Sequence, residues 1–137
     1  MRLADYTDYT LRVLMDCATH PDRLITIAEI ADRHGVSKNH LMKIVNDLAR
    51  QGVIGTTRGR GGGLRLLKRP DDIRVGDIVR SCETDFRLVE CFDRATNSCS
   101  LTPTCRLKGL FGSALQAYFK ALDAATLADI TGPAPAA

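Results

Sequence analysis

Two short amphipathic segments separated by a glycine-containing turn, within residues 26–52, constrain the fold of this chain most strongly. The first begins with the capping-box spacing of Thr26 and Glu29, and the second follows Ser37, a favourable helix N-cap. The sequence HGVS interrupts the helical periodicity between them, and Gly52 ends the second segment. The positions expected to face the core are Ile27, Ile30, Ala31, Leu41, Ile44, Val45 and Leu48. This pattern predicts a helix-turn-helix.

The second of these helices presents a polar face opposite its apolar stripe. At a rotation of about 100° per residue, that face comprises Asn39, Lys43, Asn46 and Arg50. Recognition helices insert their N-terminal residues into the major groove of DNA. The residues expected to contact base edges and flanking phosphates are therefore Ser37, Lys38, Asn39, His40 and Lys43. The alternative is a polar helix face that contacts only solvent.

A hairpin rich in glycine and arginine follows this helix directly. In VIGTTRGRGGGLRLLKRP, the apolar stretches 53–57 and 64–67 flank a turn that carries Arg58 and Arg60 at its tip. The glycines of the turn allow the backbone to approach a phosphate or to enter a narrow minor groove. The nucleotide-binding pattern GxxxxGK followed by Ser or Thr is absent. The helix-turn-helix and this wing together predict binding to double-stranded DNA.

The distribution of charge supports the same prediction. The 137-residue chain has a net charge of +3, but residues 33–74 contain ten Lys or Arg and only three Asp or Glu. Such a basic block fits contacts with phosphates, although a cluster of charged residues by itself is usually just a solvated face of the protein. No apolar run approaches the roughly 20 residues of a membrane span, and the first residues lack the apolar core of a signal peptide. We therefore expect a cytoplasmic protein without membrane contact.

Amphipathic segments flank the DNA-binding region on both sides. Residues 3–18 have helical periodicity, with Cys17 on the core-facing stripe. Residues 73–82 form a shorter piece that ends at Cys82, which has no obvious partner and is interpreted as structural. Both segments are expected to complete the core of one winged helix-turn-helix domain.

The last predicted helix is long. Thr102 and Pro103 mark its start, and apolar positions repeat at steps of three and four over about 23 residues, or roughly 35 Å. A small domain does not need such a helix for its own core, so we expect it to pack in a symmetric homodimer that reads a palindromic operator. The fold class is mainly α with a small β-hairpin. The expected segments are a winged helix-turn-helix domain (1–80), a cysteine-containing loop (81–106), a dimerisation helix (103–127) and a flexible tail (131–137).

Three of the five cysteines lie close together in the stretch VECFDRATNSCSLTPTCRLK, at Cys91, Cys99 and Cys105. In a reducing cytosol such cysteines are more often ligands, nucleophiles or core residues than disulfides. Cys105 is expected in the first turn of the long helix, where the helix dipole favours a thiolate. Three thiolates suit zinc or an iron-sulfur cluster, but a four-cornered site needs another ligand. Three unrelated buried thiols remain the simpler alternative.

A thiol enzyme is disfavoured by the positions of the histidines. His34 and His40 belong to the DNA-binding segment and His20 to a loop, and none has a spacing from a cysteine that indicates a catalytic pair. No catalytic residue is therefore predicted.

The segments MRLADYTDYTLRVL, GVSKNHLMKIVNDLARQG, RGRGGGLRL and CSLTPTCRLK with LADI further on resemble the Rrf2 family of winged-helix, iron-sulfur transcription regulators over nearly the whole chain. The resemblance implies a homodimer whose cluster is held by cysteines that map onto Cys91, Cys99 and Cys105. The segments TDYTLR and LTPTCRLK are similar to the nitric-oxide-sensing repressors of this family. In those proteins the fourth ligand resembles Asp8 and comes from the other subunit. The implied cofactor is a 4Fe-4S cluster, with 2Fe-2S as the alternative, and the implied signal is nitric oxide.

Other branches of the family remain as alternatives. A two-iron branch carries a histidine three residues after its third cysteine, where this chain has Lys108. An iron-responsive branch of repressors has cysteine gaps like those here, but usually carries Asn at the position of Asp8. A DNA-binding dimer without a cluster is a third possibility. For Asp8 itself, the alternative to a ligand is an exposed helix acid that pairs with Arg12, four residues further on.

Overall fold

The computed structural model describes residues 1–132 and contains six α-helices and one β-hairpin in that range. This confirms a mainly α fold with a small hairpin. The expected flexible tail, 131–137, falls outside the described residues except for Thr131 and Gly132. The elements are α1 (Asp5–Thr19), α2 (Ile27–His34), α3 (Lys38–Arg50), β1 (Ile54–Thr57), β2 (Gly63–Leu66), α4 (Val75–Cys82), α5 (Arg106–Asp123) and α6 (Leu127–Thr131), with 3-10 turns η1 (Pro70–Asp72), η2 (Glu90–Phe92) and η3 (Thr102–Thr104).

The core lies where α1 meets α2, α3 and the hairpin. Val13 and Leu14 of α1 and Ile44 of α3 are fully buried in one apolar cluster. Cys17 belongs to the same cluster, and burial raises the pKa of its thiol to about 11. The interpretation of Cys17 as a core residue is therefore confirmed.

The helix-turn-helix forms as the capping residues predict, with one difference. The Thr26 hydroxyl accepts the amide N–H of Glu29 at 3.1 Å, and Ser37 caps α3 by accepting that of His40 at 3.2 Å. The carboxylate of Glu29 does not complete the capping box, because it pairs with Arg23 at 3.1 Å instead. Between the helices Gly35 has φ +65°, a left-handed conformation that closes α2 without strain only for glycine.

The wing is joined to the domain by a third stretch of extended chain. β1 and β2 pair antiparallel, with Ile54 opposite Leu66. Leu64 also exchanges two backbone hydrogen bonds with Ile25, at 3.0 and 2.7 Å. A Cβ atom on Gly63 would lie 2.8 Å from the carbonyl oxygen of Ile25, so only glycine permits this approach. The base of the wing is therefore rigidly attached next to the start of α2.

The long helix is shorter than the sequence predicts. The 103–127 helix was expected to begin at a Thr102 cap, but Thr102–Thr104 form η3 and α5 runs only from Arg106 to Asp123. The chain then turns into α6, which was not predicted. Thr126 and Asp129 form a reciprocal capping box there, and Leu127 is buried in the main core. The helix breaks because α6 must return to pack against α1, with the Leu127 amide donating to the Ile73 carbonyl at 2.8 Å.

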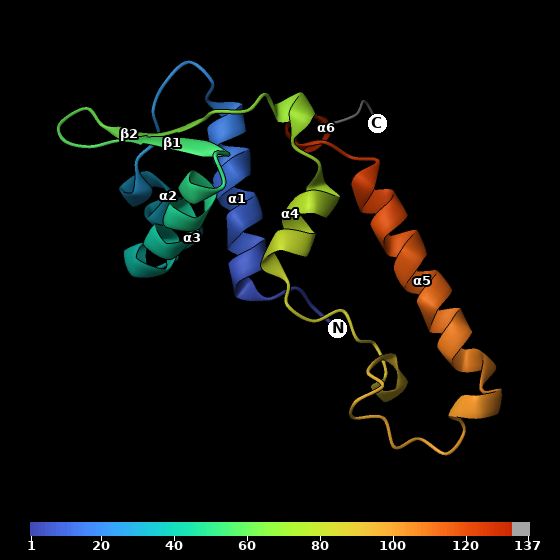
Figure 1. Cartoon of the computed structure of the whole chain (residues 1–137). Coiled ribbons are helices and arrows are strands. Elements are labelled where there is room, and N and C mark those ends of the chain that lie inside the picture. The colour runs from blue at the N-terminus through green and yellow to red at the C-terminus, as the bar shows by residue number, and fades with distance from the viewer. Residues whose placement is uncertain (133–137) are drawn as a thin grey trace.

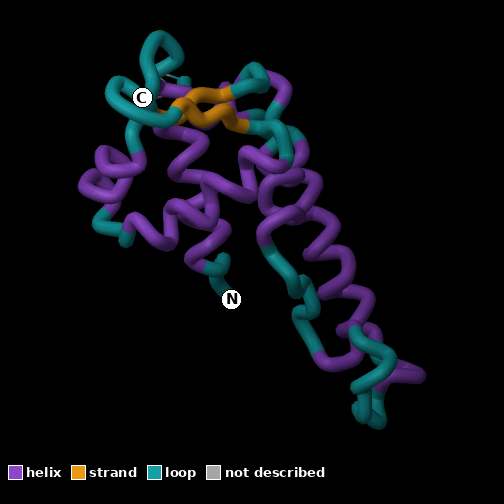
Figure 2. Tube along the Cα trace, turned by 60° about the vertical axis from the view of Figure 1, so that its left-hand side comes forward, coloured by secondary structure: helices purple, strands orange, loops and turns teal. Residues whose placement is uncertain are grey.

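The arrangement places the segment between α4 and α5 far from the helix-turn-helix and the wing. Figures 1 and 2 show α5 leaning away from the compact domain, with the segment between α4 and α5 at its distal end. Within residues 1–132, no helix combines the length and apolarity that a membrane crossing requires.

Replacing Leu127 with alanine should destabilise the domain by about 2–5 kcal/mol, because a fully buried leucine loses its packing. Ile130 on the same short helix is 40% exposed, so Ile130→Ala is the matched control and should cost much less. Chemical denaturation of both variants measures the difference. Equal losses would mean that α6 does not depend on its contact with the core.

Candidate functional site

The exposed face of α3 contains the residues expected to read DNA. Lys38, Asn39 and Lys43 are exposed, as is Asn46 one turn further on. Ser37 lies at the start of the helix, where its hydroxyl is engaged as the N-cap. This arrangement presents amide and ammonium groups on the surface of the second helix of the motif, which is the helix that enters the major groove in helix-turn-helix proteins.

Two of the predicted DNA contacts also pack against α1. The His40 ring lies edge-on to Tyr9, with 5.2 Å between ring centroids, and it is only partly exposed. The Lys43 ammonium lies 5.6 Å from the centroid of Tyr6. α1 therefore holds the side of α3 from which these two side chains project.

A hydrogen bond between Tyr6 and Asp47 completes this contact. The Tyr6 hydroxyl donates to the Asp47 carboxylate, which also pairs with Arg50. Burial and this hydrogen bond raise the pKa of Tyr6, and the Tyr6 hydroxyl is the main cause that lowers the pKa of Asp47. Sequence reasoning did not identify this link, because the partners lie 41 residues apart.

A groove of about 420 Å³ separates α3 from the wing. Its walls include Met42 and Asn46 of α3 and Thr57 and Arg58 of the hairpin. Met42 was not among the predicted contacts, yet it is 49% exposed in the middle of the recognition helix. The apolar side chain of Met42 lies on the exposed surface between the two elements that are expected to meet DNA.

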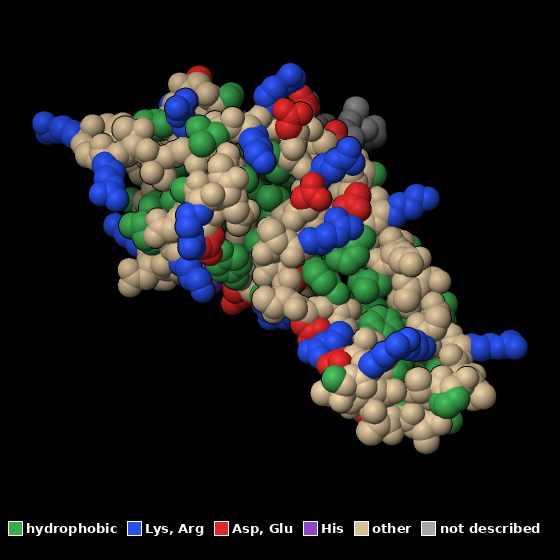
Figure 3. Space-filling model, viewed as in Figure 1, with side chains coloured by type: hydrophobic (Ala, Val, Ile, Leu, Met, Phe, Trp, Pro, Cys, Tyr) green, Lys and Arg blue, Asp and Glu red, His purple; other side chains and the backbone are tan. Residues whose placement is uncertain are grey.

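The tip of the wing carries exposed positive charge. Arg58 and Arg60 are exposed at its tip, and Figure 3 shows Lys and Arg side chains gathered around this end of the molecule. Neighbouring arginines of the basic block are paired, Arg33 with Asp16 and Arg69 with Asp71. Among residues 1–132, no ion pair engages Arg58 or Arg60. Both guanidinium groups therefore remain available to phosphates.

The three clustered cysteines lie in the segment between α4 and α5, which we call the cysteine lobe (residues 83–105). Cys91 is in η2, Cys99 is in the exposed loop and Cys105 immediately precedes α5. All three are free thiols. Cys105 was expected inside the first helical turn, but the 3-10 turn η3 makes it the N-cap residue instead. Its side chain makes no capping hydrogen bond, so the thiol is not engaged by the helix.

Hydrogen bonds tie the neighbours of these cysteines together. The carboxylate of Glu90, next to Cys91, accepts the amide and the hydroxyl of Ser98, next to Cys99, at 2.8 and 2.7 Å. These two donors lower the pKa of Glu90. The Thr102 hydroxyl in turn donates to the Cys99 carbonyl at 2.9 Å. The lobe is therefore a connected structure and not three separate positions.

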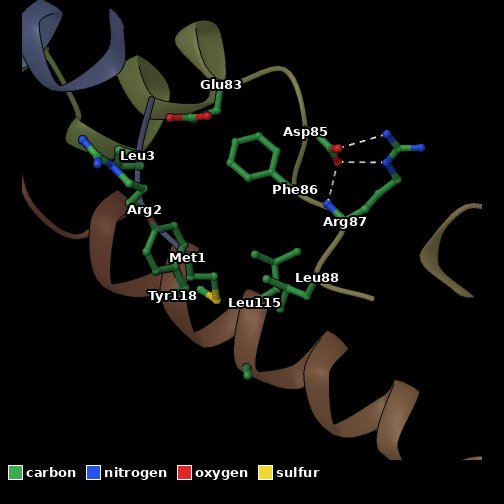
Figure 4. Close-up of a pocket in the computed structure, with 11 residues that line it drawn as sticks. Met1, Arg2, Leu3, Glu83, Asp85, Phe86, Arg87, Leu88, Leu115 and Tyr118 are labelled. Atoms are coloured by element: carbon green, nitrogen blue, oxygen red, sulfur yellow. Dashed lines mark hydrogen bonds and ion pairs between the residues drawn. The ribbon is translucent and has the colours of Figure 1, made fainter. Parts of the chain in front are cut away.

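The root of the lobe is fixed to α5 and to itself. Phe86 packs edge-on against Phe119 of α5, with 4.8 Å between ring centroids. Arg87 pairs with both Asp85 and Asp93, at 2.8 and 2.6 Å, and its guanidinium lowers the pKa of Asp85 to about 2. Figure 4 shows the guanidinium and the backbone amide of Arg87 both donating to Asp85, beside a mostly apolar pocket.

Asp8 lies in the first turn of α1. Figure 1 shows α1 in the compact domain, and the segment between α4 and α5 at the far end of α5. Its carboxylate pairs with Arg12 at 3.0 Å, which is the alternative considered from the sequence. Within residues 1–132 of the single chain, no three side chains of Cys, His, Asp or Glu are grouped so that they could hold a metal ion. The single chain therefore supplies three thiols in one lobe and a carboxylate elsewhere.

The histidines have partners on other elements. His34 binds the buried carboxylate of Asp16 at 2.8 Å, and His20 contacts the Asp16 carbonyl at 3.0 Å. His40 packs against Tyr9.

Known proteins resemble this chain over almost its whole length. Residues 3–133 match the Rrf2 family, described as "Iron-dependent Transcriptional regulator". The HTH-type transcriptional regulator NsrR of Bacillus licheniformis is 49% identical over 131 residues, which are 95% of this chain and 92% of the relative. T. potens IscR superposes with a TM-score of 0.73 at 27% identity, over 95% of this chain and 85% of that chain. Oxidised CymR of Staphylococcus aureus shares the fold, with a TM-score of 0.79 at 24% identity over 99% of this chain and 100% of that chain.

Proposed function

Because this chain belongs to the Rrf2 family and is a DNA-binding transcriptional repressor similar to NsrR, we propose that an iron-sulfur cluster in the cysteine lobe controls its affinity for operator DNA and that nitric oxide is the signal. The observation that carries the proposal is the lobe itself, in which three free thiols lie along one hydrogen-bonded segment. α3 and the wing supply the DNA-binding surface. No catalytic role is proposed for any residue.

The donor set of the lobe fits an iron-sulfur cluster. Cys91 and Cys105 are half-buried and Cys99 is exposed, so all three thiols are accessible to metal, in contrast to the buried thiol of Cys17. Soft thiolates are the ligands that iron-sulfur clusters require. We propose that these three cysteines hold a 4Fe-4S cluster, with 2Fe-2S as the alternative. When bound, the cluster supplies iron centres that react with nitric oxide.

The fourth ligand is proposed to be Asp8 of a second copy of the chain. α5 supports this dimer because none of its residues is buried in the single chain. Its apolar side chains Leu107 and Leu110 are 53% and 64% exposed. Apolar side chains exposed along one helix indicate a protein contact. A symmetric homodimer through α5 would bring α1 of one subunit toward the lobe of the other, and its two copies of α3 would read a palindromic operator.

The mechanism follows from what these side chains do. The three cysteines fix the lobe of one subunit, and Asp8 fixes the start of α1 in the other, so the separation of the two recognition helices is set. A carboxylate oxygen holds thiophilic iron less firmly than a thiolate does, so Asp8 would be the weakest of the four ligands. Arg12 pairs with the Asp8 carboxylate at 3.0 Å on the same helix and would provide its counter-charge whenever that carboxylate is free of metal. Nearly complete switching needs a difference in DNA affinity of about 10⁴-fold, or about 5.5 kcal/mol.

Operator binding before and after anaerobic addition of nitric oxide tests this proposal. The dimer purified without oxygen should be brown, should contain iron and sulfide in matching amounts, and should bind its operator tightly. Affinity should fall after nitric oxide is added. A colourless protein would contradict the cluster, and an unchanged affinity would contradict nitric oxide as the signal.

Iron status is the second candidate signal. The family description as iron-dependent and the seven-residue gap between Cys91 and Cys99 favour it. Under this alternative, operator affinity should fall when a chelator lowers free iron to the concentration found in iron-starved cells. Nitric oxide should then have little effect. The same binding assay distinguishes the two signals.

Alanine at Arg58 and Arg60 should weaken operator binding and reduce its dependence on salt. Each contact with a phosphate contributes about 0.9 to the slope of log K against log salt concentration, so the double variant should lose about 2 from that slope. Arg69 is a suitable control, because it is exposed but paired with Asp71 away from the wing tip. An unchanged slope in the double variant would mean that the wing does not contact the DNA backbone.

A further inference from the structure

The carboxylate of Glu83 caps the N-terminus of α1 from a distant part of the chain. Its Oε1 accepts the amide N–H of Ala4 at 2.7 Å and the hydroxyl of Thr7 at 2.8 Å. Ala4 is the N-cap residue of α1 and has no side chain that can accept a hydrogen bond. The first turn of α1 therefore depends on an acceptor supplied 79 residues further along the sequence.

This contact is protected and carries charge. Thr7 is fully buried, so its hydroxyl has no water to replace Glu83 as an acceptor. A negative charge at a helix N-terminus is also favoured by the helix dipole. Loss of a hydrogen bond to a charged group changes a local opening equilibrium by about tenfold or more. The first turn of α1 should therefore become loose when Glu83 is removed.

Glu83 also lies at the root of the cysteine lobe. It is the residue directly after α4, where the chain leaves the DNA-binding domain. Figure 4 shows Glu83 at the end of this helix near Leu3, with Asp85, Phe86 and Arg87 following it toward α5. Because Phe86 packs on α5 and Arg87 bridges to Asp93 inside the lobe, a movement of the lobe is carried to Glu83 over a short, braced segment.

The same turn of α1 contacts the recognition helix. Tyr6, next to Thr7, donates its hydroxyl to Asp47 of α3, and Lys43 of α3 lies over the Tyr6 ring. The contact with Glu83 and the contact with α3 are thus made by adjacent residues of one helical turn, Thr7 and Tyr6. A shift of Thr7 relative to Glu83 must also shift Tyr6 relative to α3.

We propose that Glu83 is a positioning residue that transmits the state of the cysteine lobe to the recognition helix through the first turn of α1. The contacts run from Glu83 to Thr7, and from Tyr6 to Asp47. The inference rests on the proposed control of DNA binding by the lobe. It adds a route within one subunit to the connection between subunits that Asp8 provides.

Hydrogen exchange in the cluster-free protein tests the capping role. Glu83→Ala should speed exchange of the Ala4 and Asp8 amides, the hydrogen-bonded amides of this turn, by about tenfold or more. Thr7→Val should do so in part, because it removes one of the two hydrogen bonds to Glu83. Asp77→Ala is the matched control, because Asp77 is an acid of α4, the helix that Glu83 follows, and its side chain is 68% exposed. Equal exchange in Glu83→Ala and the control would overturn the capping role.

Operator binding tests the transmission. The measured quantity is the ratio of operator affinities with and without the cluster, which must reach about 10⁴-fold for nearly complete switching. Glu83→Ala should lower this ratio by about tenfold or more, because the hydrogen bonds to a charged group are lost while the connection through Asp8 remains. Its iron and sulfide contents should stay at the wild-type level, and Asp77→Ala should keep the ratio. If Glu83→Ala does not fold, Thr7→Val should still lower the ratio. If Glu83→Ala folds, the double variant should lower the ratio no further than Glu83→Ala alone.

The outcomes separate this inference from the function on which it rests. A wild-type ratio of one would contradict the proposed function and the transmission together. A wild-type ratio well above one that Glu83→Ala and Thr7→Val both preserve would overturn only the role of Glu83.

Discussion

Replacement of Cys99 with alanine is expected to remove the iron and sulfide from the dimer while leaving the fold intact. Cys99 is exposed, so its removal creates no cavity in the core. Loss of one thiolate ligand should lower cluster content by more than about tenfold, since loss of a residue that only hydrogen-bonds to a metal ligand already costs about that much in metal affinity. The colour of the anaerobic protein, its iron and sulfide contents, and its thermal stability measure the effect.

Cys82 provides the control for this experiment. It is half-buried and packs against the core at the end of α4, outside the lobe. Cys82→Ala should therefore lose a little stability and keep the full cluster, which is the opposite of the pattern for Cys99. If the two variants retained equal amounts of iron, the lobe would not be the cluster site. Cys91→Ala and Cys105→Ala should behave as Cys99→Ala does.

The DNA-binding half of the fold could be predicted because its signals are local. Thr26, Ser37 and Gly35 act within one helical turn of their own positions, so the sequence around each determines what it does. α6 was missed although Thr126 and Asp129 carry a capping box. The apolar periodicity of α5 runs on toward residue 125, and only the burial of Leu127 against α1 shows why the helix must stop.

The candidate site also has parts that the sequence could predict and parts that it could not. The cysteines were identified by residue type and proximity in sequence, and the structure joins their neighbours through Glu90 and Ser98. The link from Tyr6 to Asp47 and the cap from Glu83 to Thr7 left no signal in the sequence, because their partners lie 41 and 76 residues apart. Such pairs depend on how the helices pack, and a single sequence does not report that.

Asp8 poses a different problem, because its proposed role lies between two chains. In the single chain its carboxylate pairs with Arg12, and each side chain is nearly half exposed. An exposed i, i+4 ion pair contributes only about 0.3–0.5 kcal/mol, so it does not hold Asp8 back from a metal. Asp8→Ala should therefore leave the dimer folded and lower its cluster content. That result alone would not tell which subunit supplies the ligand.

Mixed dimers should identify the subunit. A dimer of one Asp8→Ala chain and one Cys99→Ala chain has one complete site if Asp8 reaches across the interface, and none if it stays within its own chain. A dimer of the double variant with the wild type has the reverse: no complete site in the first case and one in the second. We expect about half of the wild-type iron in the first mixed dimer and almost none in the second, measured after tandem affinity purification of differently tagged chains. The opposite pattern would place Asp8 and the cysteines in the same subunit, and equal iron in both would remove Asp8 from the ligand set.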